Sequence, residues 1–223
     1  AGVSIKNNDG AANTALGTYA CIGNQARIVS GMASGAEGIV TGKSGRFADH
    51  VVCHFKKSDL EKMSPGDKVL VKAFGVGLRF MDFPEVDIKS CDPGLLERLQ
   101  ITIQSGVLTI PVKSVVPNRI IGAGSGFQSE SKVLNLQMTD PDVRREARLD
   151  DLRFGDLVAV QDWDSRFTHG YLRGFTAIGI VSQGDSIRSG YGPGITIVMT
   201  GSSKQIKPEI VEEANIAQYL GLL

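Results

Sequence analysis

The sequence has few of the residues that assign a protein to a chemistry. Of its 223 residues, 3 are cysteines and 3 are histidines, aromatic residues make up 6%, and the 24 lysines and arginines equal the 24 aspartates and glutamates. Three widely spaced cysteines fit neither a disulfide framework nor a Cys-x-x-Cys zinc site, so we expect them to be reduced and buried. Balanced charge provides no overall field toward nucleic acid or an anionic membrane. Nucleic acid is therefore disfavoured as a partner.

Long apolar runs are also absent. The longest, such as residues 195–199, are far shorter than the roughly 20 residues that cross a bilayer as a helix. No basic and apolar signal pattern opens the chain. The sequence therefore predicts a soluble, cytoplasmic protein with no membrane partner.

What the chain does contain is glycine, with 27 residues, and alternating apolar and polar positions. Such alternation is typical of strands that bury one face. The pattern predicts a mainly β fold, with strands over 25–31, 37–42, 50–55, 67–74, 106–116, 132–138, 156–163, 176–181 and 194–201. On the strand at 50–55, His50 and His54 should share a half-exposed face while Cys53 points the other way.

Short helices are expected between the strands. Asp92 and Asp140 each precede a proline, and an aspartate cap followed by proline at the first helical position is a typical helix start. Ser58 and Glu61 have the spacing of a capping box. The sequence also predicts a C-terminal helix over about 208–220.

The length allows two modest domains. We predict a small β-barrel domain over residues 1–103 and a layered β-sandwich domain with glycine-rich loops over 104–223. The division follows the helix that begins after Asp92.

Residues 23–45 resemble the KOW motif of ribosomal and transcription-elongation proteins. They combine an alternating strand, a glycine turn at Gly31, and Gly35 and Gly38 before a second strand. The resemblance implies an SH3-like barrel that binds RNA. RNA-binding versions are rich in lysine and arginine, whereas the cations in or beside this stretch are only Arg27, Lys43 and Arg46.

A polar loop follows the strand at 156–163. Its charged and imidazole groups are Asp162, Asp164, Arg166, His169 and Arg173. Carboxylates and an imidazole in one loop can hold a divalent ion or act as acid and base. The candidate metal ligands are Asp162, Asp164 and His169, and these three with Asp185 are the candidate catalytic residues. The loop could equally be a solvated hairpin end, so no cofactor is predicted and a divalent metal is left open.

A glycine-rich loop, VSQGDSIRSGYGPG, occupies residues 181–194. Backbone N–H groups in such a loop can cradle a carboxylate or phosphate, and a tight β connection needs glycine as well. As a ligand site, the loop would bind through Gly190, Gly192, Gly194 and Arg188, with Arg166 and Arg173 from the polar loop.

Ser186 lies in a Gly-Asp-Ser sequence that resembles the nucleophile motif of one family of serine esterases and lipases. A glycine-rich turn follows it where that family has a helix, and no histidine occurs among the later residues. We therefore predict that Ser186 holds a turn by local hydrogen bonds.

Four segments together resemble a bacterial and archaeal family of two-domain β proteins catalogued only as a domain of unknown function. They are PGDKVLVKAFGVGL, VVPNRIIGAGSG, the DWD loop and GDSIRSGYGPGITIVMTG. The resemblance implies a small barrel joined to a layered sandwich, and it implies no activity. Members read Gly-His-Gly-Pro-Gly where this chain has Tyr191, so no histidine chemistry carries over to that position.

These observations predict a homo-oligomer that binds a small anionic molecule in its second domain. Hydrolase or lyase activity is left open, as is whether the chain is an enzyme at all. The alternatives are an RNA-binding module built on the KOW-like hairpin and a purely structural assembly protein.

Overall fold

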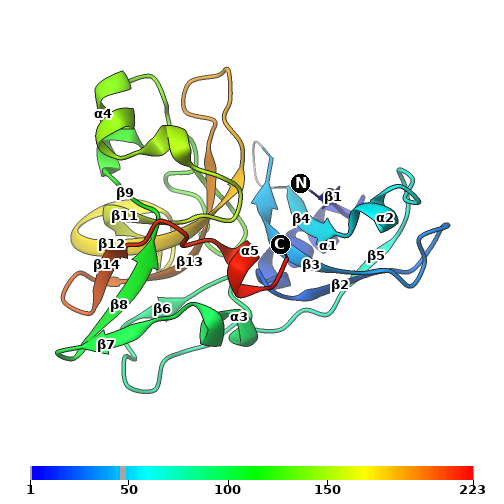
Figure 1. Cartoon of the computed structure of the whole chain (residues 1–223), viewed down its shortest axis with the longest axis horizontal. Coiled ribbons are helices and arrows are strands. Elements are labelled where there is room, and N and C mark those ends of the chain that lie inside the picture. Colours follow the sequence, from blue (N-terminus) through cyan, green and yellow to red (C-terminus); the bar gives the residue numbers. More distant parts are fainter. Residues whose placement is uncertain (1, 46–48, 223) are drawn as a thin grey trace.

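The computed structural model describes residues 2–45 and 49–222, which form two lobes side by side (Figure 1). The lobe drawn in blue to cyan contains one sheet, and the larger lobe contains two. The predicted mainly β class is confirmed, and each of the predicted strands overlaps an observed strand. Arg46 lies outside the described residues.

The smaller lobe is a five-stranded antiparallel half-barrel. Its core is apolar and includes Val40, Cys53 and Phe55. The turn between its second and third strands places Gly31 and Gly35 at φ values of 71° and 96°, as a tight hairpin requires. The strand order is β1 (Val3–Ile5), β4 (His50–Phe55), β3 (Glu37–Ser44), β2 (Gln25–Ile28) and β5 (Val69–Val71).

The larger lobe is layered around a mixed six-stranded sheet. Its strand β11 is buried on both faces, because Leu157 and Ala159 join one apolar cluster while Val158 and Val160 join another. The order is β10 (Leu134–Asn135), β13 (Gly194–Ser202), β12 (Gly170–Gln183), β11 (Leu157–Asp164) and β9 (Ser114–Val116), with β6 (Asp87–Ile88) paired to β13. A three-stranded sheet contributes to the first cluster; its order is β14 (Ile206–Ile210), β8 (Val107–Val112) and β7 (Thr102–Gln104).

Two helices begin as the sequence predicts. The Asp92 and Asp140 side chains accept hydrogen bonds from backbone N–H groups at the starts of α3 (Pro93–Arg98) and α4 (Pro141–Glu146). Two 3-10 helices, η1 (Asn118–Ile120) and η2 (Leu149–Asp151), lie in the same lobe. Aspartate followed by proline is therefore a reliable helix start in this chain.

Three other helices differ from expectation. The short helix α2 (Lys57–Leu60) is present, but its N-cap is Lys56 and no side chain caps it, so Ser58 does not play that part. The C-terminal helix is confirmed but short, α5 (Ile216–Tyr219), because residues 206–210 pair with β8 as strand β14. The helix α1 (Gly10–Tyr19) was not predicted, since small residues dominate it and its apolar stripe is weak.

Residues 83–99 pack with the larger lobe. Val86, Ile88 and Leu95 belong to the apolar cluster that also contains Leu108 and Ile110 of β8. The domain division at residues 103 and 104 stays a prediction.

All three cysteines are free and buried, as expected. In the part of the chain that the structure describes, no helix has the length and apolar character needed to cross a membrane.

Candidate functional site

The charged groups of the polar loop are engaged with their own neighbours. The Arg166 guanidinium forms an ion pair with Asp164 at 3.1 Å and lies 4.4 Å from the centre of the Phe175 ring. Asp162 occupies a bulge in β11, where its Oδ1 accepts a hydrogen bond from the Gly174 N–H at 2.8 Å. Arg173 is exposed.

His169 is turned into the protein interior, with 1% of its surface exposed. Its Nε2 lies 3.2 Å from the Lys132 carbonyl and its Nδ1 lies 3.0 Å from the Ser165 hydroxyl. Burial lowers the pKa of His169 to about 4, so the imidazole is neutral. It then donates from Nε2 and accepts from Ser165, which leaves no ring nitrogen for a ligand.

The three candidate metal ligands, Asp162, Asp164 and His169, thus make separate contacts. Among residues 2–45 and 49–222, no three histidine, cysteine or acidic side chains gather closely enough to hold a metal ion. The divalent metal stays a prediction.

The glycine-rich loop between β12 and β13 is held by local bonds and close packing. Asp185 Oδ1 accepts the Ser186 N–H at 2.7 Å, and the Ser186 hydroxyl accepts the Arg188 N–H at 3.1 Å. Gly190 crosses Gly122 of the preceding glycine loop, since a Cβ on Gly122 would lie 2.4 Å from the Gly190 Cα. These contacts fit a compact chain crossing.

Two further glycines of this loop also lack room for a side chain. A Cβ on Gly192 would lie 2.4 Å from the Gly184 carbonyl oxygen, and one on Gly194 would lie 2.8 Å from the Gln183 Cβ. Arg188 is exposed. An anion site made by this loop stays a prediction.

The two loops leave opposite ends of β12, yet one segment touches both. The Ala123 N–H donates to the Gly190 carbonyl and the Gly126 N–H donates to the His169 carbonyl, both at 2.7 Å. Three residues of extended chain span at most about 11 Å. The loops therefore approach each other, although their arginines do not share one of the two cavities described below.

Replacing Ser186 by alanine should lower the free energy of unfolding by at most about 1 kcal/mol, the usual worth of one hydrogen bond. The reason is that the hydroxyl accepts one backbone N–H and contacts no histidine of the described chain. Denaturant titration measures this change. Hydrolysis of a short acyl ester that is lost in Ser186→Ala, while the fold survives, would instead restore Ser186 as a nucleophile.

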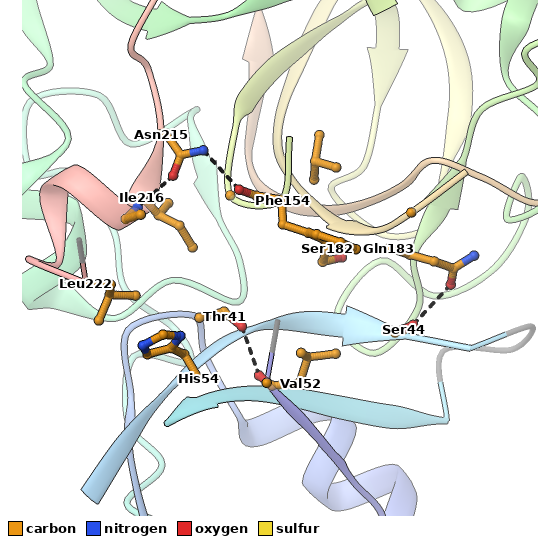
Figure 2. Close-up of a pocket in the computed structure, with 15 residues that line it drawn as sticks. Thr41, Ser44, Val52, His54, Phe154, Ser182, Gln183, Asn215, Ile216 and Leu222 are labelled. Atoms are coloured by element: carbon orange, nitrogen blue, oxygen red, sulfur yellow. Dashed lines mark hydrogen bonds between the residues drawn. The ribbon is translucent and has the colours of Figure 1, made fainter. Parts of the chain in front are cut away.

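A cavity of about 410 Å³ lies between the lobes, where no site was predicted. Figure 2 shows side chains from both lobes around it. The smaller lobe contributes β3 and β4, and the larger lobe contributes the end of β12 and the region of α5. The labelled lining residues are Thr41, Ser44, Val52 and His54 on one side and Phe154, Ser182, Gln183, Asn215, Ile216 and Leu222 on the other.

Most polar side chains of this cavity are already bonded to the protein. Asn215 Nδ2 donates to the Phe154 carbonyl at 2.9 Å, and its Oδ1 accepts the Ala217 N–H at 2.8 Å. Gln183 Nε2 donates to the Tyr191 carbonyl at 2.7 Å. These groups shape the cavity and have little bonding capacity left for a ligand.

His54 is different. Strand alternation buries Val51, Cys53 and Phe55 in the half-barrel and turns Val52 and His54 toward the cavity, as predicted for this face. The His54 imidazole forms no hydrogen bond or ion pair with any residue that the structure describes. Burial lowers its pKa, so at neutral pH the ring offers one donor and one acceptor.

A second cavity, of about 690 Å³, adjoins the first, since His54 and Leu222 line both. Its wall comes from β2, β3, α2, α3 and the C-terminal residues. Unlike the first cavity, it is lined by charged side chains, namely Glu37, Lys56, Asp59, Asp92 and Arg98.

Lys43 joins the two lobes beside these cavities and is 1% exposed. Its N–H donates to the Thr196 hydroxyl at 3.0 Å, and its carbonyl accepts the Ser182 hydroxyl at 2.7 Å. Its ammonium donates to the Ser90 hydroxyl and the Glu130 carbonyl. Burial lowers the pKa of Lys43 to about 8. So enclosed a group is not available to an RNA phosphate.

Beside Lys43 the two backbones nearly touch. A Cβ on Gly42 would lie 2.2 Å from the Ser182 Cβ. Only glycine lets β3 approach β12 this closely.

Comparisons with known proteins agree with this two-part architecture. The structure described as "Crystal structure of TM1086" is similar to this chain, with 37% identity, a TM-score of 0.92, and coverage of 97% of this chain and 76% of that chain. No curated protein matches the sequence. Family models described as "Domain of unknown function (DUF4438)" match at residues 1–97 for the N-terminal part and 98–220 for the C-terminal part. The chain therefore belongs to the DUF4438 family, as its resemblance to a two-domain family of unknown function predicted.

Proposed function

We propose that this protein binds a small, mostly apolar molecule in the cavity between the lobes, with His54 as the hydrogen-bonding group. Ligand cavities in proteins typically measure 300 to 1,000 Å³ and combine apolar walls with a few polar groups. The 410 Å³ cavity matches this description, and no lysine, arginine, aspartate or glutamate lines it.

The observation that carries the proposal is the unbonded imidazole of His54. His54 is half-buried and lines the cavity, so a ligand there can take the hydrogen bonds that its ring nitrogens otherwise make with water. The predicted anionic ligand at the glycine-rich loop, the hydrolase or lyase activity and the homo-oligomer stay predictions, as do the RNA-binding and assembly alternatives.

Binding of N-phenyl-1-naphthylamine, a neutral probe that fluoresces in apolar sites, tests the proposal. Wild-type protein should enhance its fluorescence. Ala217→Trp places an indole in the cavity and should abolish the enhancement, whereas Gln218→Trp, on the exposed side of α5, should not. Equal enhancement in Ala217→Trp and wild type, or none in wild type, would refute the cavity as a binding site.

His54→Phe keeps a ring of similar shape and removes both nitrogens. We expect it to weaken probe binding about fivefold, the worth of roughly one hydrogen bond. His50→Phe is the matched control, because His50 lies on the same strand outside the cavity and contacts Asp49. Equal probe affinity in His54→Phe and wild type would remove His54 from the proposal.

A further inference from the structure

We propose that the two cavities are one groove and that its ligand is an amphiphile with a zwitterionic head group. The apolar part would lie in the 410 Å³ cavity and the head group in the 690 Å³ cavity. This inference rests on the proposed function and specifies its ligand.

The first argument is that one sheet face lines both cavities. Ile39 and His54 are paired residues of β3 and β4. Two residues away in one direction, Thr41 and Val52 line the first cavity. Two residues away from the Ile39–His54 pair in the other direction, Glu37 and Lys56 line the second cavity. Because alternate residues of a strand share a face, this wall is continuous.

The wall changes character along its length. It starts at Val52, passes the neutral imidazole of His54 and ends at Lys56, at the start of α2. On β3, Glu37 lies two residues before Ile39 and on the same face, at the charged end of the wall. Four residues of strand span about 13 Å. An apolar, then hydrogen-bonding, then charged surface over this distance fits a molecule with an apolar end and a charged end.

The second argument concerns the sign of the charges. Asp92 is occupied, because it caps α3 and accepts a hydrogen bond from Asn24 at 2.8 Å. The other four, Glu37, Lys56, Asp59 and Arg98, form no side-chain hydrogen bond or ion pair within residues 2–45 and 49–222. With Asp92, three of the charged groups that line the cavity are acidic and two are basic.

The presence of both signs in one cavity selects against a singly charged head group. A carboxylate would be attracted by the two basic groups and repelled by the acidic ones, and for an ammonium the attraction and repulsion are reversed. Like-charge contacts oppose binding and are a common source of specificity. A head group with one ammonium and one carboxylate can place each charge against its opposite.

Competition with N-phenyl-1-naphthylamine by four compounds with the same octyl chain tests this. They are 2-aminodecanoate, nonanoate, octylammonium and 1-octanol. We expect 2-aminodecanoate to displace the probe at a concentration at least about tenfold lower than any of the other three. Equal competition by all four would overturn the zwitterionic head group and leave the apolar site standing, whereas a probe that does not bind at all would overturn both proposals.

Two variants test whether the preference for the zwitterionic compound comes from the charges of the second cavity. Arg98→Glu should remove the advantage of 2-aminodecanoate over octylammonium, because Lys56 is then the one basic group among the charged lining residues named above and the acidic groups favour the cation. Lys57→Glu is the matched control, since Lys57 is exposed on α2 but does not line the groove. If both variants shift the preference equally, the effect is one of net charge and the proposed head-group position is wrong.

Discussion

Relative to Lys43→Met, which also lacks the ammonium, Lys43→Ala should lower the free energy of unfolding by about 3 kcal/mol. Both substitutions remove the ammonium, so the Ser90 hydroxyl and the Glu130 carbonyl keep only the hydrogen bond that joins them. Alanine also empties the volume of a fully buried side chain. Large-to-small changes in a core cost about 2 to 5 kcal/mol. Denaturant unfolding measures the loss, and a loss below about 1 kcal/mol would show that the interface repacks around the gap.

Lys43→Met separates packing from charge, because it keeps most of the volume and removes the ammonium. The pKa of Lys43 is about 8 in the folded protein, below its ordinary 10.5. Below pH 8 the lysine is charged in both states, so folding bears the full cost of burying the charge. Above pH 10.5 it is neutral in both states and that cost is gone.

Relative to Lys43→Met, wild-type protein should therefore gain stability as the pH rises from 8 to 10.5. The lowering of the Lys43 pKa from 10.5 to about 8 corresponds to a gain of up to about 3 kcal/mol. The difference between the two proteins is the quantity to measure, because the buried cysteines, whose pKa values burial raises, act in the opposite direction in both. A constant difference across this range would mean that the Lys43 pKa is not lowered.

Gly122→Ala should cost about 3 kcal/mol, which is large for the addition of one methyl group. Its Cβ would lie 2.4 Å from the Gly190 Cα and 2.5 Å from the Gly190 carbonyl oxygen, so one of the two loops must move. Forced backbone shifts of this kind typically cost about 1 to 3 kcal/mol and occasionally more. Thermal or denaturant unfolding measures the change.

Gly170→Ala is the matched control for Gly122→Ala. Nothing lies within 4 Å of a Cβ at Gly170, and its φ is not in the left-handed range. We expect a change within about 0.5 kcal/mol, as for an ordinary surface substitution. Equal costs at the two positions would show that the loop crossing yields without strain.

The strands were predictable because their alternation comes from local burial. The first half of β11, residues 157–160, is a continuous apolar run, which is typical of a strand buried on both faces, and these four residues are all buried. The short strands β6 and β14 were not predicted. Their pairing partners lie elsewhere in the chain, and two to five residues carry too little periodicity to announce a strand.

The cavity could not be predicted from the sequence in the same way. The prediction for His54 was a half-exposed strand face, which is correct. The sequence does not indicate which residues form the wall opposite His54, because only the packing of the two lobes brings Phe154 and Ile216 there. The composition of the polar loop, by contrast, suggested a site, but Arg166 is paired with Asp164, and His169 is bonded to Ser165 and to the Lys132 carbonyl.

The contact between Gly42 and Ser182 limits how far the two lobes can move apart. The backbones of β3 and β12 nearly touch there, and hydrogen bonds from the Lys43 N–H and to the Lys43 carbonyl join the two lobes beside this contact. Hinge opening at that edge would break several buried hydrogen bonds at once. A ligand is therefore expected to enter the cavity between the lobes from the side opposite Gly42, past Leu222 and the residues just before it. The rate at which these residues move out into solvent should then set the rate at which a ligand enters and leaves.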